Sequence, residues 1–310
     1  MSGPERCTGV ALRFTGLIGL KRRMNAEMIF DARAALGEGA LWHDRRLLWV
    51  DIEGCSVNRF DPVTRRNESW HLGQRVGTVV PRAAGGFVVG VQHGVGFLDP
   101  ATGKLEVFAN PEAGRPHMRF NDGKCDPRGR LFAGTMALEK PREAGSLYRI
   151  DPDRTVTRVI SGTGTSNGLA WNHDATVMYY IDTPTLEVSA FDYDASTGAI
   201  THRRTAVRFS TDLGRPDGMT IDAAGNLWVA MYGGGRVLGC DPRTGKIFEQ
   251  IDVAASRTTS CAFGGPNLDD LFITSAGGDS SDRGDNERYA GAICVARPGV
   301  QGVPAFAFAG

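Results

Sequence analysis

The sequence of 310 residues predicts an all-β fold, a six-bladed β-propeller, and three observations support this class. Short runs rich in Val, Leu, Trp, Tyr and Phe recur along the chain, as is typical of β-strands. No segment keeps a helical spacing of apolar residues over three turns. Turn signals in which aspartate follows a strand-like residue recur at 60–66, 98–104, 150–156, 193–199 and 240–246.

The strongest strand-like runs occur once in each unit of roughly 40 to 55 residues, the range of a four-stranded propeller blade. A single blade cannot bury both of its faces, whereas a ring of blades buries them and removes most exposed edges. We expect the ring to close through one blade that combines the start, 28–36, with the apolar end, 304–310. A linear sandwich is the alternative. The six runs are 46–52, 86–92, 130–136, 177–183, 226–232 and 270–276.

Composition and charge restrict the partners. The chain has 35 basic and 35 acidic residues and no net charge, which argues against nucleic-acid and anionic-membrane partners. It has no run of 18 apolar residues that would span a membrane. Residues 1–27 are interpreted as a poorly ordered leader, because Arg13 interrupts the apolar stretch 9–20, and 28–310 as one propeller domain. The six cysteines form no CxxC pair, which favours reduced thiols in a cytoplasmic protein.

We identify the residue at the start of the innermost strand of each unit. The spacing between successive positions is roughly 41 to 50 residues. Innermost strands all run the same way along the channel, so residues at one phase form a ring at one mouth. Carboxylates and amides that converge there must be paired or hold an ion, and oxygen ligands suit a hard divalent cation. The alternative is a set of ordinary hairpin turns. The six positions are Glu38, near Val80, Asn121, Asn167, Asp217 and near Cys261.

At these residues the chain resembles the gluconolactonase and regucalcin (senescence marker protein) family over about residues 30–300. The resemblance implies a six-bladed propeller with one divalent metal ion in its channel, with Ca²⁺ favoured and Zn²⁺, Mn²⁺ or Mg²⁺ as alternatives. It also implies hydrolysis of a small sugar lactone, such as gluconolactone, to the aldonic acid. The motifs that carry it are LGEGALW (36–42), RFNDGKCDPRGRLFAGTM (119–136), GSLYRID (145–151), SNGLAW (166–171) and RPDGMTIDAAGNLWVA (215–230).

The resemblance assigns roles residue by residue. It implies that Glu38, Asn167 and Asp217 are the protein ligands of the metal. Asp217 is in addition the candidate catalytic residue, because a carboxylate within hydrogen-bond reach can take a proton from the attacking water.

The substrate-binding residues implied by the resemblance are Arg119, Asn121 and Glu139. Arg119 can grip hydroxyl or carbonyl oxygens with its planar set of donors. Glu139 lies in a loop that departs from the family pattern. Asp122 has two readings, as part of the site or as a cap at a strand end, and His117 is a further candidate for a substrate contact.

Two other functions stay open at this stage. The first is a non-catalytic, calcium-binding regulatory propeller of the regucalcin type, because the propeller fold serves both classes. The second is hydrolysis of a phosphotriester or aromatic ester. A serine nucleophile at Ser166, in the GxSxG match at 164–168, is disfavoured because no helix follows it. The expected partner is a small sugar lactone, and we expect a monomer or a weak homo-oligomer.

Overall fold

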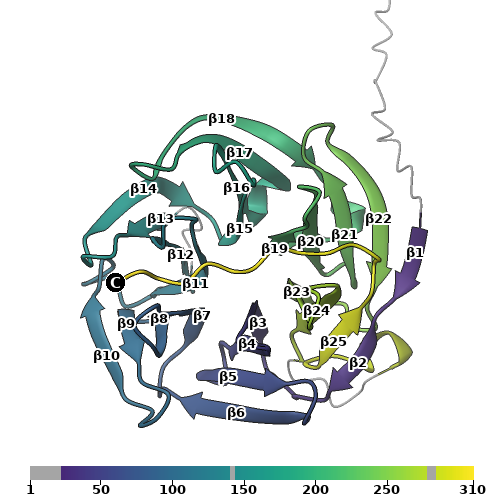
Figure 1. The fold of residues 1–310 in the computed structure, drawn as a ribbon, viewed down its shortest axis with the longest axis horizontal. Helices are drawn as coiled ribbons and strands as arrows, with labels where there is room; N and C mark the ends of the chain where they lie inside the picture. Colours follow the sequence, from purple (N-terminus) through teal and green to yellow (C-terminus); the bar gives the residue numbers. More distant parts are fainter. Residues whose placement is uncertain (1–21, 140–143, 278–283) are drawn as a thin grey trace, which may run out of the picture.

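The computed structural model describes residues 22–139, 144–277 and 284–310, which form six β-sheets arranged in a ring (Figure 1). This confirms the predicted six-bladed β-propeller. In the described part of the chain, no helix is long and apolar enough to cross a lipid bilayer. Within these ranges, three short 3₁₀ helices lie between strands, namely η2 (Thr183–Thr185), η3 (Thr211–Leu213) and η4 (Asp285–Glu287).

Each blade is built on consecutive antiparallel strands, four in each of the first five blades and three in the sixth, with the first strand on the inside of the ring. The first blade contains β3 (Gly37–His43), β4 (Arg46–Asp51), β5 (Ser56–Asp61) and β6 (Arg66–His71). The second contains β7 (Val76–Pro81), β8 (Phe87–Val91), β9 (Gly94–Leu98) and β10 (Leu105–Ala109). The third contains β11 (Met118–Cys125), β12 (Leu131–Ala137), β13 (Gly145–Ile150) and β14 (Val156–Thr163).

The other three blades follow the same order. The fourth contains β15 (Ser166–Trp171), β16 (Val177–Asp182), β17 (Glu187–Asp194) and β18 (Ala199–Arg208). The fifth contains β19 (Arg215–Ile221), β20 (Leu227–Tyr232), β21 (Arg236–Asp241), β22 (Lys246–Asp252) and β1 (Arg22–Asn25). The sixth contains β23 (Thr258–Gly264), β24 (Asp270–Ser275), β25 (Ile293–Ala296) and β2 (Glu27–Phe30). The six strand-like runs of the sequence are the second strands, β4, β8, β12, β16, β20 and β24.

The ring closes at its N-terminal end as predicted, but the C-terminal half of the predicted closure is wrong. Strand β2 pairs with β25 and becomes the outermost strand of the sixth blade. Strand β1 pairs in parallel with β22, so the ordered fold starts before residue 28. Residues 304–310 add no strand to the sixth blade and instead cross the ring (Figure 1). The predicted leader otherwise lies outside the described residues.

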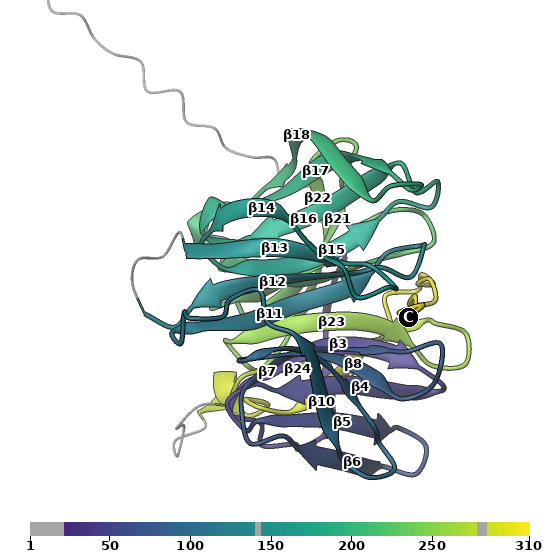
Figure 2. The same ribbon diagram turned by 90° about the vertical axis from the view of Figure 1, so that its left-hand side faces the viewer.

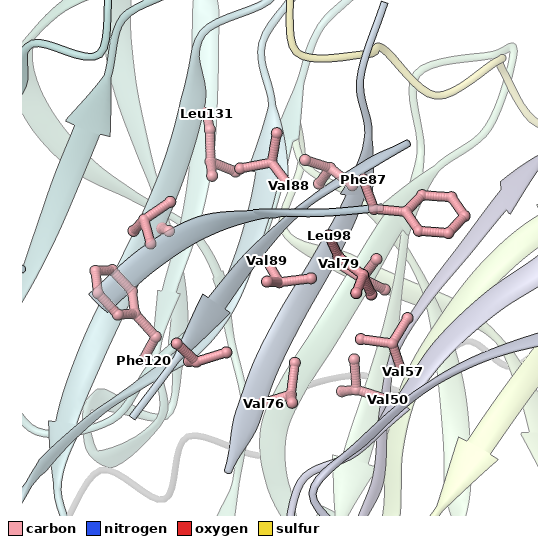
Figure 3. Packing of buried hydrophobic residues seen from close by; sticks show 14 of the residues in the cluster. Val50, Val57, Val76, Val79, Phe87, Val88, Val89, Leu98, Phe120 and Leu131 are labelled. Atoms are coloured by element: carbon pink, nitrogen blue, oxygen red, sulfur yellow. The ribbon is translucent and has the colours of Figure 1, made fainter. Parts of the chain in front are cut away.

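Apolar side chains from neighbouring blades hold the ring together (Figure 3). Val50 and Val57 of the first blade belong to the same buried cluster as Val76 and Val79 of β7. Phe120 of the third blade extends this cluster across the second blade. Each fully buried side chain of this size contributes roughly 1.5–3 kcal/mol to folding. The packed blades therefore form a rigid frame that fixes the positions of the innermost strands.

The last ten residues, 301–310, form a segment that we call the C-terminal strap, and it lies on one face of the disc (Figure 2). Its backbone joins four blades through hydrogen bonds. Gly302 N–H donates to the Leu268 carbonyl in the sixth blade, and Ala223 N–H donates to the Gln301 carbonyl from the fifth. Near the other end, Phe308 N–H donates to the Pro81 carbonyl, and Ala309 N–H donates to Gly129. The strap therefore ties opposite sides of the ring.

Phe308→Ala should lower the free energy of unfolding by about 3–5 kcal/mol, because it empties a fully buried site in the strap. The Phe308 ring packs against Phe97 at 6.4 Å between ring centroids. Phe306→Ala is the matched control, because Phe306 is 42% exposed and should change stability by about 0.5 kcal/mol or less. Urea unfolding measures both variants, and a midpoint of Phe308→Ala equal to that of the wild type would show that burial of Phe308 in the strap does not stabilise the ring.

Candidate functional site

The innermost strands depart from regular pairing close to the predicted ring positions. Asn121, Asn167 and Asp217 are each the first residue of a bulge, where strand pairing skips two residues. Glu38 immediately precedes the bulge of β3. A bulge re-aims side chains and is common next to functional sites. The ordinary hairpin-turn alternative is therefore wrong, since these residues lie inside strands.

Two of the six predicted ring positions need correction. The bulges of β7 and β23 lie at Gly77 and Thr259, so the ring positions precede Val80 and Cys261. Val80 and Cys261 are fully buried core residues. Strands β7 and β23 have no acidic or amide residue at the position that faces the ring. The sequence of these two strands therefore did not indicate which residue takes that position.

The glycines that follow Asn167 and Asp217 allow neighbouring innermost strands to approach closely. A Cβ atom at Gly168 would lie 2.8 Å from the Asp217 carbonyl oxygen. A Cβ atom at Gly218 would lie 2.6 Å from the Ser260 hydroxyl oxygen. Both separations are too short for a side chain, so the glycines set the spacing that brings the ring residues together.

The predicted site residues Arg119, Asn121 and Asn167 are linked by hydrogen bonds. Arg119 Nη1 donates to Asn121 Oδ1 at 2.6 Å, and Asn121 Nδ2 donates to Asn167 Oδ1 at 2.9 Å. All three are buried, with exposed fractions of 6%, 4% and 3%. Asn121 is therefore fixed between an arginine and a second amide.

Glu38 and Asp217 are buried carboxyls in one electrostatic cluster with Arg119. Burial raises the pKa of Glu38 to about 8, and the charge of Asp122 adds to this rise. Burial also raises the pKa of Asp217 well above its usual range, and the charges of Glu38 and Asp122 act in the same direction. Burial lowers the pKa of Arg119 to about 10, partly offset by Glu38. Carboxyls placed in this way are stabilised by a shared proton or by a cation.

Two polar atoms of the cluster lack hydrogen-bond partners among the described residues, Asp217 Oδ1 and Arg119 Nε. The Glu38 carboxylate accepts from the Gly39 N–H of its own bulge at 3.2 Å. A buried carboxylate oxygen without a donor is costly unless something else stabilises its charge. Asp217 Oδ1 is thus suited to a cation, and Arg119 Nε is suited to an acceptor on a ligand.

The oxygen-only donor set of Glu38, Asn167 and Asp217 fits a hard divalent cation. Carboxylate and amide oxygens are the ligands that Ca²⁺ takes in proteins. Across the described ranges, no group of three or more His, Cys, Asp and Glu side chains is arranged to hold a metal ion. The predicted ligand set consists of two carboxylates and one carboxamide, that of Asn167.

A pocket of about 720 Å³ opens beside the cluster. Thr183 lines this pocket and also accepts a hydrogen bond from Asn167 Nδ2 at 2.8 Å. Arg215, two residues before Asp217, lies in the same wall. The predicted substrate residue Glu139 is exposed and lines the pocket, so the structure places it at the rim and not in the buried cluster. Its role as a substrate contact stays a prediction.

Asp122, His117 and Ser166 are three other residues that the sequence singled out. Asp122 is buried, and its Oδ1 accepts from Gly123 N–H at 2.7 Å, so it lies in the cluster and also caps its own bulge. His117 is half-buried, and its carbonyl accepts from Leu138 N–H near the pocket. Ser166 is fully buried, and its hydroxyl accepts from the Tyr180 hydroxyl at 2.8 Å. This contact fits the structural role expected for Ser166.

Sequence reasoning missed Thr183 and Lys124. Thr183 lies in η2, outside every innermost strand, so the ring phase could not identify it. Lys124 does lie on β11, and its Nζ donates to the Met219 carbonyl at 2.7 Å. The FNDGKCD motif contains Lys124, but the sequence analysis assigned roles only to Asn121 and Asp122 of this motif. Burial lowers the pKa of Lys124, while the charge of Asp122 raises it.

The fold and the buried cluster together define a class, a six-bladed propeller with an acidic, oxygen-lined site at its central channel. The chain belongs to the SMP-30/Gluconolactonase/LRE-like family, whose model matches residues 36–277. This agrees with the resemblance found in the sequence motifs.

Individual relatives extend the match to most of the chain. A regucalcin of Danio rerio is 40% identical over 293 residues, which are 93% of this chain and 99% of the relative. The Bacillus subtilis (strain 168) protein YvrE, whose name proposes a sugar lactone lactonase, is 38% identical with the same coverage. The crystal structure of a calcium-binding protein, regucalcin, from Agrobacterium tumefaciens str. C58 matches with a TM-score of 0.86 and 25% identity. That match covers 92% of this chain and 98% of the other.

Proposed function

We propose that the protein hydrolyses a sugar lactone to the corresponding aldonic acid and that this activity depends on a divalent cation. One observation carries the proposal. Asp217 Oδ1, a buried carboxylate oxygen without a partner among the described residues, lies in one electrostatic cluster with Glu38 and Arg119. A pocket of about 720 Å³, lined by Glu139 and by Thr183, which accepts a hydrogen bond from Asn167, has room for a monosaccharide-sized ligand. The family membership and the name of YvrE support the same substrate class.

The proposed chemistry is attack of water on the lactone carbonyl carbon. When bound, a divalent cation supplies positive charge that polarises the carbonyl group and makes water more acidic. Asp217 takes the proton of the attacking water, because a positioned carboxylate within hydrogen-bond reach can act as a general base. The bond between the carbonyl carbon and the ring oxygen then breaks, and the ring oxygen takes the proton held by Asp217 and becomes the new hydroxyl of the open acid.

Arg119 and Asn121 orient the substrate in this proposal. Arg119 has a free Nε–H donor in the described structure, and it offers that donor to a hydroxyl or carbonyl oxygen. Asn121 is neutral, so it fixes Arg119 without cancelling the charge of a cation. Glu38, Asn167 and Asp217 hold the cation. We favour Ca²⁺, because all three offer oxygen ligands, with Zn²⁺, Mn²⁺ and Mg²⁺ as alternatives.

A calcium-binding regulator without turnover is the second candidate. The names of the regucalcin relatives favour it, as does the description of the Agrobacterium protein as calcium-binding. This alternative requires the cation ligands but no substrate contacts. Arg119, which is buried with an unpaired donor, favours the enzyme.

Removal of divalent cations should abolish lactone hydrolysis, and Ca²⁺ or Mn²⁺ should restore it. A proton-release assay on a panel of aldonolactones measures the rate, with enzyme-free lactone as the blank for spontaneous opening. Wild-type protein that binds Ca²⁺ but opens no lactone in the panel would favour the regulator. A rate that survives chelation unchanged would exclude a cation-dependent mechanism.

A further inference from the structure

A chain of hydrogen bonds runs through the cluster and continues beyond the predicted site residues. It passes from Arg119 to Asn121 and then to Asn167, as described above. Asn167 Nδ2 donates to Thr183 Oγ1 at 2.8 Å, and Thr183 Oγ1 donates to the Pro216 carbonyl at 2.8 Å. Pro216 directly precedes Asp217, so the chain ends at the backbone of that residue.

The two ends of the chain fix its direction. Arg119 can only donate, so Asn121 must present its oxygen to Arg119 and its NH₂ group to Asn167. Asn121 Nδ2 also donates to the Ser166 carbonyl at 2.7 Å, and that carbonyl can only accept. Asn167 must therefore accept through Oδ1. Its NH₂ group then faces Thr183.

The side chain between Asn167 and Pro216 must accept one hydrogen bond and donate another. The Thr183 hydroxyl can do both at once. It accepts from Asn167 Nδ2 and passes its own proton to the acceptor-only Pro216 carbonyl. The backbone of Thr183 is itself anchored, since its N–H donates to the Thr165 carbonyl at 3.1 Å. A methyl group in place of the hydroxyl would remove both of these hydrogen bonds.

We propose that Thr183 is a positioning residue that sets the orientation of the Asn167 carboxamide and ties it to the backbone of Asp217. With Nδ2 held by Thr183, Oδ1 of Asn167 faces the cluster, and its second lone pair is available to a cation. The inference rests on the proposed function, because it requires Asn167 to be a cation ligand. Partners that orient metal ligands typically affect metal affinity by about 10- to 100-fold when they are lost.

The test replaces Thr183 with valine, which keeps the shape and removes the hydroxyl. Calcium titration by calorimetry and Tb³⁺ luminescence should show about 10- to 100-fold weaker binding by Thr183→Val. Thr183→Ser keeps the hydroxyl and should bind within about threefold of the wild type. Saturating Ca²⁺ should restore most of the lactonase rate of Thr183→Val, which a general structural defect would not allow. Thr183→Ala is the substitute if the valine variant does not fold, with the same expected loss.

Thr185→Val is the matched control. Thr185 lies in the same 3₁₀ helix, and its hydroxyl donates to the Asp182 carbonyl at 2.7 Å without touching the cluster. It should bind Ca²⁺ as the wild type does. Equal affinities of Thr183→Val and wild type would overturn the inference, as would an equal loss in Thr185→Val. Failure of the wild type itself to bind Ca²⁺ or Tb³⁺ would instead contradict the proposed cation site.

Discussion

Asp217→Asn is expected to lower kcat/KM for the best lactone by about 10²- to 10⁴-fold, the usual contribution of a positioned base. The asparagine keeps the volume and one oxygen of the side chain. It removes the negative charge that would hold the cation and the basic oxygen that would take the proton. Proton-release kinetics at saturating Ca²⁺ measure the loss of turnover. Calcium titration of the same variant measures the loss of affinity.

The structural integrity of this variant can be checked independently. The pKa of Asp217 is raised mainly by burial, so neutral asparagine should leave the metal-free protein at least as stable as the wild type near pH 8. Asp174→Asn is the control for removal of a negative charge, because Asp174 is exposed and lines a different pocket, which contains no residue of the cluster. A folded Asp217→Asn variant with wild-type turnover would exclude Asp217 as the base and as an essential ligand.

The sequence predicted the ring of site residues because propeller blades repeat at a nearly constant length. Glu38, Asn121, Asn167 and Asp217 occupy one phase of that repeat, and all four begin or adjoin a bulge. The repeat does not encode residues that reach the site from other elements. Thr183 enters from η2, after the second strand of its blade, and no periodic signal marks that position.

The closure of the ring is a second feature that the sequence did not predict in full. The start and the end of the chain both look like strands, and alternating apolar residues at 304–310 would suit a blade edge. Only β2 takes that place, next to β25. The strap instead buries Phe308 against the second blade. The apolar pattern at 304–310 predicts burial of Phe308, but it does not identify the blade against which Phe308 packs. That blade depends on how far the chain runs across the ring after the sixth blade.

The stability of the metal-free protein should fall as pH rises from about 5 to about 8. Glu38 has a folded pKa of about 8 against 4.5 for the ordinary carboxyl, so the folded state binds the extra proton between these values. A state that binds more protons loses stability as the proton concentration falls. The slope is about 1.4 kcal/mol per pH unit for each carboxyl that titrates in this way. Asp217 contributes in the same direction.

A bound cation should reverse this dependence, because it replaces the proton at the same carboxylates. The increase in Tm caused by a fixed concentration of Ca²⁺ is therefore expected to grow with pH between about 5 and about 8. Thermal unfolding with Ca²⁺ and with a chelator, over that range, gives the difference directly. Glu38→Gln serves as the control, since it should be more stable than the wild type at pH 8 without metal and should gain little from Ca²⁺. A calcium effect that is constant or that shrinks with rising pH would show that Glu38 does not exchange its proton for the cation.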